Sequence, residues 1–151
     1  MLEKSQEKNI TINRKASHDY FIHQTYEAGI VLVGTEVKAL RQNRANLIDS
    51  YASVTNGEVW LMNANISVYD QGSYNNHDPL RKRKLLLSKS EIRKLNKAVS
   101  EKGSTLIPLR LYFKDGKVKV ELAVASGKRK YDKREDIAKR DLNREMQRKL
   151  I

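Results

Sequence analysis

The stretch that decides the fold is Leu109-Arg-Leu-Tyr-Phe-Lys-Asp-Gly-Lys-Val-Lys-Val-Glu-Leu-Ala-Val-Ala125. Two strand-like runs, Leu109–Lys114 and Lys117–Ala125, flank Asp115-Gly116, a dipeptide that tolerates the positive φ angles of a type I′ turn. The second run alternates two sets of side chains, Val118, Val120, Leu122 and Val124 against Lys119, Glu121 and Ala123. This period of two predicts a hairpin with one buried face and one solvent-exposed face.

A second hairpin is predicted upstream, where Tyr51–Thr55 and Glu58–Met62 flank Asn56-Gly57. Tyr20–Tyr26 also has the composition of a strand. Pro108 has no N–H to donate to a sheet, so we expect it at a strand start or a sheet edge.

Two helices are predicted. Ser88-Lys89-Ser90-Glu91 forms a capping box, and Gly103 ends the helix that it begins. The buried stripe of this helix is predicted to be Ile92, Leu95 and Val99. A shorter helix, Glu36 to Asn43, follows Gly34-Thr35.

Several short antiparallel strands must hide their edges, which favours a closed or nearly closed barrel. The predicted fold class is therefore mostly β: a small oligonucleotide-binding-like antiparallel β-barrel with two or three flanking helices and a flexible C-terminal tail. We expect a flexible N-terminal arm over residues 1–12, an RNA-binding barrel over 13–127 and a basic tail over 128–151.

The composition points to a polyanionic partner. The 151 residues carry a formal net charge of +12 and a sequence pI near 9.9, which favours nucleic acid first and an anionic membrane surface second. The absence of cysteine excludes disulfides, thiolate metal sites and a cysteine nucleophile. No apolar run approaches the ~20 residues of a membrane span, and the polar N-terminus does not resemble a signal peptide. We expect a soluble, cytoplasmic protein.

The sequence offers little to catalysis. It lacks the phosphate-loop, nucleophile-elbow and dinucleotide-binding motifs. His18 and His23 are five residues apart, so on the predicted first strand they point to opposite faces and cannot share a metal. Glu27 has no second carboxylate or base beside it, and a structural role is the simpler interpretation. We therefore expect neither an enzyme nor a cofactor.

Two basic segments suggest binding. Arg81-Lys82-Arg83-Lys84 precedes Leu85-Leu86-Leu87, so leucines could anchor a strand while the cations meet phosphates; the alternative is a solvated charge run that guards a sheet edge. Tyr20, Phe21 and Tyr26 lie near basic residues, an arrangement suited to stacking on unpaired bases, although aromatic residues on strands more often pack in a core.

The tail from Lys128 to Ile151 has ten Lys or Arg against five Asp or Glu. On a helix its apolar residues would form one narrow stripe, made of Ala138, Leu142, Met146 and Leu150. A single unpartnered stripe does not hold a helix firmly in water. We expect this segment to be disordered when free and helical on a large anionic partner; the alternative is a solvated helix that ends the domain.

Three longer stretches are more specific. They are Asn13-Arg-Lys-Ala-Ser-His-Asp-Tyr-Phe-Ile22 continuing to Gly34-Thr-Glu-Val-Lys-Ala-Leu-Arg41, then Asp78-Pro-Leu-Arg-Lys-Arg-Lys-Leu-Leu-Leu87, and Gly127-Lys-Arg-Lys-Tyr-Asp-Lys-Arg134. In this ordered combination the chain closely resembles the SsrA-binding protein (small protein B) family of bacteria from about Asn13 onward. The resemblance implies an RNA-binding adaptor that binds the tRNA-like domain of transfer-messenger RNA and delivers it to stalled ribosomes for trans-translation, standing in for the missing codon–anticodon pair.

The resemblance also implies partners: transfer-messenger RNA, the small-subunit decoding centre and mRNA channel of the ribosome, and, through the RNA, alanyl-tRNA synthetase and elongation factor Tu. It implies no membrane partner, no metal and a monomer. The implied RNA-binding residues are Asn13, His18, Tyr20, Glu27, Gly29, Lys38, Arg41, Arg83, Lys84, Leu85, Lys128 and Lys130. The implied ribosome-binding residues of the tail are Asp132, Lys133, Arg134, Ile137, Leu142 and Met146.

A carboxylate beside RNA must orient a basic residue or accept a hydrogen bond from a base, and we expect His18 to be the partner of Glu27. Leu142 stands where family members often carry Trp.

Two other classes of function compete: a general single-stranded nucleic-acid-binding or ribosome-associated module, and an RNA-processing nuclease. The nuclease lacks any paired-carboxylate or metal constellation in the sequence.

Overall fold

A computed structural model of the chain describes residues 6–68 and 76–128. The elements within them, in chain order, are β1 (Glu7–Ile12), α1 (Arg14–Asp19), β2 (Tyr20–Ile30), α2 (Gly34–Arg41), β3 (Ala45–Asn46), β4 (Tyr51–Thr55), β5 (Glu58–Met62), β6 (Asn65–Ile66), β7 (Arg83–Leu86), α3 (Lys89–Lys102), β8 (Thr105–Lys114) and β9 (Lys117–Gly127). The mostly antiparallel β fold with flanking helices confirms the predicted class.

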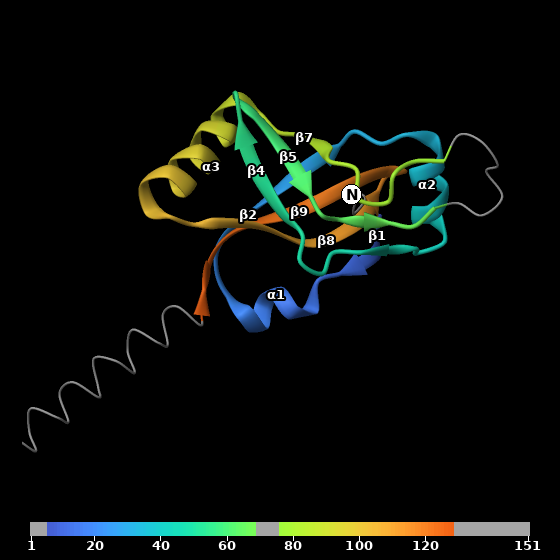
Figure 1. The fold of residues 1–151 in the computed structure, drawn as a ribbon, viewed down its shortest axis with the longest axis horizontal. Helices are drawn as coiled ribbons and strands as arrows, with labels where there is room; N and C mark the ends of the chain where they lie inside the picture. The colour runs from blue at the N-terminus through green and yellow to red at the C-terminus, as the bar shows by residue number, and fades with distance from the viewer. Residues whose placement is uncertain (1–5, 69–75, 129–151) are drawn as a thin grey trace, which may run out of the picture.

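The main sheet closes on itself. The strands pair in the order β8-β4-β5-β7-β2-β9, and β9 pairs again with β8. β4 pairs with the first part of β8, at Ala52↔Leu106. β1 pairs with the later part of β8, from Ile12↔Arg110 to Glu7↔Lys114. Figure 1 shows α3 and α2 at opposite ends of the barrel, with α1 outside it.

Both predicted hairpins are confirmed. Asn56 and Gly57 have φ angles of 52° and 75°, and Asp115 and Gly116 have 50° and 80°. Positive φ at both central residues is the signature of the type I′ turn, whose twist matches that of the flanking strands. The turn residues therefore fix the register of β4 against β5 and of β8 against β9.

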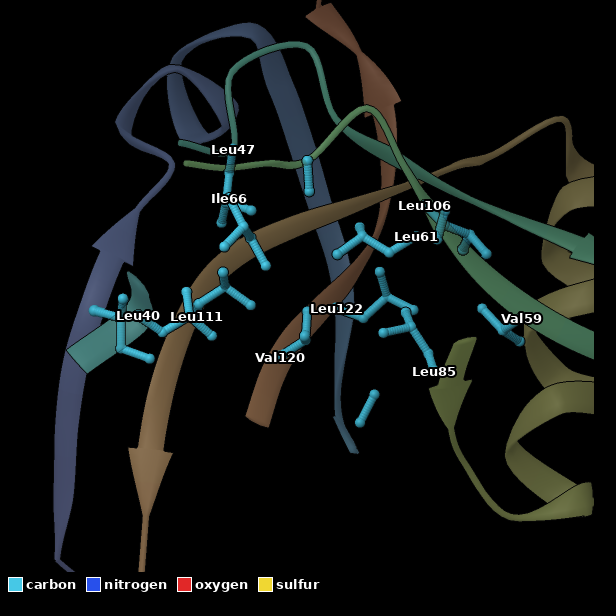
Figure 2. Packing of buried hydrophobic residues seen from close by; sticks show 14 of the residues in the cluster. Leu40, Leu47, Val59, Leu61, Ile66, Leu85, Leu106, Leu111, Val120 and Leu122 are labelled. Carbon is cyan, nitrogen blue, oxygen red and sulfur yellow. The ribbon is translucent and has the colours of Figure 1, made fainter. Parts of the chain in front are cut away.

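The core fills the barrel with aliphatic side chains from distant parts of the chain. Figure 2 shows Leu40, Leu111, Leu122, Leu61 and Leu85 converging from α2, β8, β9, β5 and β7. Each is at most 1% exposed, and full burial of a leucine contributes about 1.5–3 kcal/mol. The core thus ties helix α2 and the strands into one unit.

Helix α3 begins and ends as predicted. The Ser88 hydroxyl accepts from the backbone N–H of Glu91 while the Glu91 carboxylate accepts from the Ser88 N–H, and Gly103 adopts φ 63° at the C-cap. Leu95 is fully buried, but the prediction for Val99 is wrong because its side chain is 37% exposed. Ala98, one position earlier, packs against the core instead.

The N-terminal region differs most from the predictions. Glu7–Ile12 is strand β1, not part of a flexible arm, because Ile10 is buried and the segment pairs with β8. Arg14–Asp19 is a short helix that was not predicted, so His18 does not lie on the first strand. His18 and His23 were therefore wrongly predicted to lie on opposite faces of one strand, because only His23 is in β2.

Two details of the β8–β9 hairpin also differ. Pro108 lies inside β8 rather than at its start, and it is tolerated there because the register against β9 shifts between Pro108 and Arg110. Ala123, predicted to line the solvent-exposed face, is fully buried, as is Ala125. Ala16 of α1 packs with Ala125 in a second small apolar cluster.

In the part of the chain that the structure describes, no helix is long and apolar enough to cross a membrane.

Candidate nucleic-acid interface

Glu27 lies at the centre of a polar network on the outer face of the barrel. The Tyr112 hydroxyl donates to Glu27 Oε2 over 2.6 Å, and Lys114 Nζ lies 3.1 Å and 3.3 Å from Oε2 and Oε1. The Tyr112 hydrogen bond, followed by that from Lys114, holds the pKa of Glu27 below its ordinary value. The carboxylate is thus ionised and fixed in direction, while its side chain stays 39% exposed.

Arg110 completes this network. Its guanidinium carbon lies 3.9 Å from the centre of the Tyr112 ring, and its Nε and Nη2 donate to Glu121 at 2.5 Å and Glu7 at 3.2 Å. Burial and the Glu27 carboxylate together raise the pKa of Tyr112, so its hydroxyl remains a donor at neutral pH. The expected partner of Glu27 was wrong: His18 Nδ1 lies 3.2 Å from Asp19 Oδ1 instead.

The basic segment before Leu85 divides between the inside and the outside of the protein. Arg83 is fully buried, and its Nε donates to Glu36 Oε2 while Nη1 donates to the Ala64 carbonyl over 2.8 Å. Arg81 Nη2 donates to the second Glu36 oxygen over 2.6 Å. Direct RNA contact by Arg83 is therefore a wrong prediction, because its guanidinium faces no solvent.

Burial raises the pKa of Glu36, yet the hydrogen bonds from Arg81, the Val33 N–H and Arg83 outweigh it and leave this pKa below its ordinary value. Burial lowers the pKa of Arg83, and Glu36 opposes that effect. The pair therefore stays ionised inside the fold. It joins α2 to β7 and to the segment before β7.

Leu85 is also placed inside, at 1% exposure, so its predicted role as an RNA contact is wrong and it is a core residue. The outward-facing cations of this region are Lys82 and Lys84. Lys82 Nζ lies 5.0 Å from the centre of the Trp60 ring, and Lys84 Nζ lies 3.3 Å from Glu58 Oε1 with 40% of its side chain exposed. Lys84 can reach a phosphate from this position.

Other predicted site residues have internal roles. Asn13 Nδ2 donates to the carbonyls of Pro108 at 3.1 Å and Leu47 at 3.4 Å, which fixes the start of α1 against the barrel. Gly29 lies in β2 opposite Leu86 of β7. Tyr20 packs against the small cluster around Ala16 and is half-buried.

The remaining predicted cations are spread over the surface. Lys38 and Arg41 are exposed on α2, at the end of the barrel away from α3 (Figure 1). Lys128 Nζ donates to the Ser17 carbonyl over 3.1 Å and lies 5.3 Å from the centre of the Phe21 ring. Lys128 and exposed His18 thus belong to one region around α1, distant in sequence from Lys84.

Several predicted residues lie outside the described residues, so the structure does not place them. They are Lys130, Asp132, Lys133, Arg134, Ile137, Leu142 and Met146.

Tyr112, Lys114 and Glu36 were not among the functional residues predicted from the sequence. Tyr112 and Lys114 are two residues apart on β8, so they share a face, but only the pairing of β2 and β8 on either side of β9 brings them to Glu27. In the sequence Glu36 has the features of an ordinary carboxylate in the first turn of a helix. No local pattern indicates that Arg83 would be buried against it. No group of three or more potential metal ligands occurs in residues 6–68 and 76–128.

A small closed antiparallel barrel, carrying separated surface cations around an oriented carboxylate, defines a basic β-barrel protein of the nucleic-acid-binding class. Comparison with known proteins makes the class specific. The family model described as "SmpB protein" matches residues 10–151, and the chain belongs to this family.

Its relatives share most of its length. The chain is 61% identical over 142 residues to the SsrA-binding protein of Desulforudis audaxviator, covering 94% of this chain and 93% of the relative. It is 58% identical over 149 residues to that of Acetivibrio thermocellus, covering 99% and 97%. A solved structure described as "tmRNA-SmpB: a journey to the center of the bacterial ribosome" is 52% identical, with a TM-score of 0.66 over 78% of this chain and 82% of that one.

Proposed function

We propose that this chain is the RNA-binding adaptor of bacterial trans-translation. It binds the tRNA-like domain of transfer-messenger RNA and delivers that RNA to stalled ribosomes, where the protein takes the place of the missing codon–anticodon pair. The observation that carries this proposal is the match to SsrA-binding proteins at 61% and 58% identity over nearly the whole of both chains. The similar solved structure supports the ribosome as the place of action.

The barrel supplies the RNA-binding part of this function. Glu27 has two protein donors on its carboxylate, and its exposed side accepts a hydrogen bond from a base amino or imino group, which phosphate oxygens cannot provide. The cations Lys38, Arg41, Lys84 and Lys128 meet phosphates at other points of the barrel surface. Folded RNA is recognised through its shape, its 2′-hydroxyls and its unpaired bases, which suits contacts spread over several faces of a small barrel.

The C-terminal segment supplies the ribosome-binding part. Its Asp132-Lys133-Arg134 sequence matches the family's signature for the decoding centre, and residues 137–146 follow in the mRNA channel. This division assigns the barrel, residues 13–127, together with Lys128 and Lys130 to the RNA, and the tail from Asp132 onward to the ribosome. The excess of Lys and Arg over Asp and Glu in this segment favours its binding to ribosomal RNA.

The identity of the RNA is tested by purifying the full chain from a bacterial lysate and sequencing the RNA that it retains. We expect one abundant tRNA-like species. A broad spread of unrelated RNAs would favour a general single-stranded nucleic-acid-binding module and would overturn the proposal. Incubation of the purified protein and RNA with Mg²⁺ should leave the RNA intact, since the proposed adaptor is not an enzyme.

The division of labour is tested by deleting residues 132–151. The truncated chain should bind transfer-messenger RNA with nearly unchanged affinity but should no longer support peptide tagging on stalled ribosomes. Normal tagging by this truncation would contradict the role of the tail.

The role of Lys84 is tested by K84Q. Loss of one phosphate contact should reduce the slope of log affinity against log salt by about 0.7–0.9. The matched control is E58Q, which removes the carboxylate beside Lys84 and should leave that slope unchanged or steeper. A K84Q protein with the parental slope would remove Lys84 from the set of phosphate contacts.

A further inference from the structure

A cleft of about 720 Å³ lies between α3 and the β2–β9 ribbon. Its walls come from helix α3 on one side and from two paired strands on the other, and its lining includes Tyr26, Val124 and Ala98 at the bottom. We call it the α3 cleft. In Figure 1, α3 lies at the end of the barrel opposite α2, so this cleft is separated from the exposed Lys38 and Arg41.

The α3 cleft does not belong to the Glu27 network. Tyr26 pairs with Leu122 and Gln24 with Val124. Leu122 and Val124 are buried in the core and Tyr26 packs against it, whereas Gln24 is exposed at the cleft. Glu27 pairs with Glu121 on the opposite face of the same ribbon. Strand β2 thus contributes to two different surfaces. The proposed role of Glu27 does not involve the α3 cleft.

The charge of the α3 cleft has one sign. Lys94, Lys97 and Lys102 project from α3 into its lining, and no Asp or Glu is among the described residues that form it. Lys94 and Lys97 are exposed. In the described part of the chain these three lysines have no ion pair, whereas Lys84 and Lys114 each have a carboxylate beside them.

The opposite wall supplies hydrogen-bonding side chains. His23 Nε2 and Ser126 Oγ are 2.8 Å apart, joined across the β2–β9 pair where the register shifts between Ile22 and Gln24. Gln24 and Ser104 add further donors and acceptors to the lining. Cations on one wall, hydroxyl and amide groups on the other and an aromatic ring at the bottom are the features of a groove for single-stranded nucleic acid.

We propose that the α3 cleft is a second RNA-contact site, which binds the sugar-phosphate backbone of an unpaired RNA segment. Its volume falls in the range of small-ligand pockets, about 300–1,000 Å³, so it has room for a short piece of single strand. Lys94, Lys97 and Lys102 contact phosphates, while the Ser126 hydroxyl and the Gln24 amide are placed for 2′-hydroxyl groups. This inference rests on the proposed function in that its ligand is part of the RNA that the barrel binds.

The test compares two double variants that remove the same charge from the same helix. K94Q/K97Q alters the cleft, and K89Q/R93Q alters α3 outside the cleft lining. Affinity for transfer-messenger RNA is measured from low to physiological salt. K94Q/K97Q should reduce the slope of log affinity against log salt by about 1.4–1.8, or 0.7–0.9 for each lost phosphate contact, and K89Q/R93Q should change it by much less.

A second measurement locates the contact on the RNA. The chain contains no cysteine, so K97C and R93C each provide a unique thiol for a short photo-crosslinker. K97C should crosslink to one unpaired RNA segment, and R93C should not. Equal slopes for the two double variants, or no RNA crosslink from K97C, would overturn the cleft proposal. If the parental chain itself does not prefer the tRNA-like RNA over unrelated RNAs, the proposed function fails instead.

Discussion

The Tyr112 hydroxyl donates a 2.6 Å hydrogen bond to Glu27 across the intervening strand β9. Tyr112 is only 1% exposed, whereas the Glu27 side chain is 39% exposed. A buried donor thus orients a carboxylate that solvent and RNA can reach. Orientation by a rigid phenol fixes the exposed oxygen of Glu27 before any partner arrives, which reduces the entropy lost on binding.

Y112F should therefore weaken RNA binding without altering the surface. The substitution keeps the ring under Arg110 and removes one charge-assisted hydrogen bond, worth about 1 kcal/mol at this half-exposed carboxylate. We expect the pKa of Glu27 to rise toward its ordinary value, which NMR titration of the carboxyl carbon measures. An unchanged pKa would contradict a contribution from the Tyr112 hydroxyl.

The control for Y112F is Y51F, since Tyr51 is 40% exposed and lies on β4, away from Glu27. Both variants lose one phenolic hydroxyl. Only Y112F should lower RNA affinity, and equal losses would contradict an orienting role for Tyr112.

Acid should destabilise the fold through Glu27 and Glu36. Both carboxyls have pKa values below the ordinary value of 4.5 in the folded state. The unfolded chain therefore binds these protons first as pH falls, so the stabilisation is fully present above about pH 4.5 and is lost as pH falls through the lower folded pKa values. Urea unfolding at a series of pH values should show stability falling below about pH 4.5, and a Glu27→Gln variant should show a shallower fall. A stability independent of pH between 5 and 3 would contradict both shifts.

Removal of the buried Glu36 carboxylate should lower the free energy of unfolding far more than removal of the Arg81 guanidinium that bonds to it. E36Q leaves the fully buried Arg83 without a counter-charge, and we expect a loss of about 3 kcal/mol in the free energy of unfolding. R81Q is the matched control, because the Arg81 side chain is 33% exposed and water can solvate the remaining oxygen. It should cost about 1 kcal/mol or less. Equal costs in chemical denaturation would contradict the burial of the Arg83–Glu36 pair.

The same pair shows where sequence reasoning succeeds and where it stops. The Asp115-Gly116 and Asn56-Gly57 hairpins and the Ser88 capping box were predicted correctly because each depends on residues next to one another. Arg83 was predicted to face RNA because it stands in a run of four cations, but alternation along β7 turns it inward, where Glu36 of α2 meets it. A contact between residues 47 positions apart leaves no local signal.

The surface assignments follow the same rule. Lys84 and Glu27 both lie on the outside of the barrel, with 40% and 39% of their side chains exposed. The partner of Glu27 was missed because Tyr112 comes from a strand 85 residues away, and the unpredicted helix α1 carried His18 elsewhere. Resemblance to a family identifies which residues matter without showing which of them touch the partner.

Gly29 tests that distinction most directly. A Cβ added at Gly29 would lie 3.2 Å from Leu86 Cβ and 3.5 Å from its Cδ1. The new methyl group of G29A should therefore crowd Leu86 and strain the pairing of β2 with β7. The Leu86 side chain is 52% exposed and can turn toward solvent, but its Cβ cannot move without the backbone. We expect a destabilisation of about 1 kcal/mol, at the low end for overpacking, measured by urea unfolding.

G127A is the control for G29A, because an added Cβ at Gly127 meets nothing within 4 Å and its stability should change little. If Gly29 acts only through this packing, folded G29A protein keeps its RNA affinity and loses stability alone. The opposite pattern, parental stability with weakened RNA binding, would show that the missing Cβ leaves room for RNA rather than for Leu86. Since Gly29 follows Glu27 by two residues on β2, that result would also extend the RNA surface from the Glu27 carboxylate along the same face of the strand.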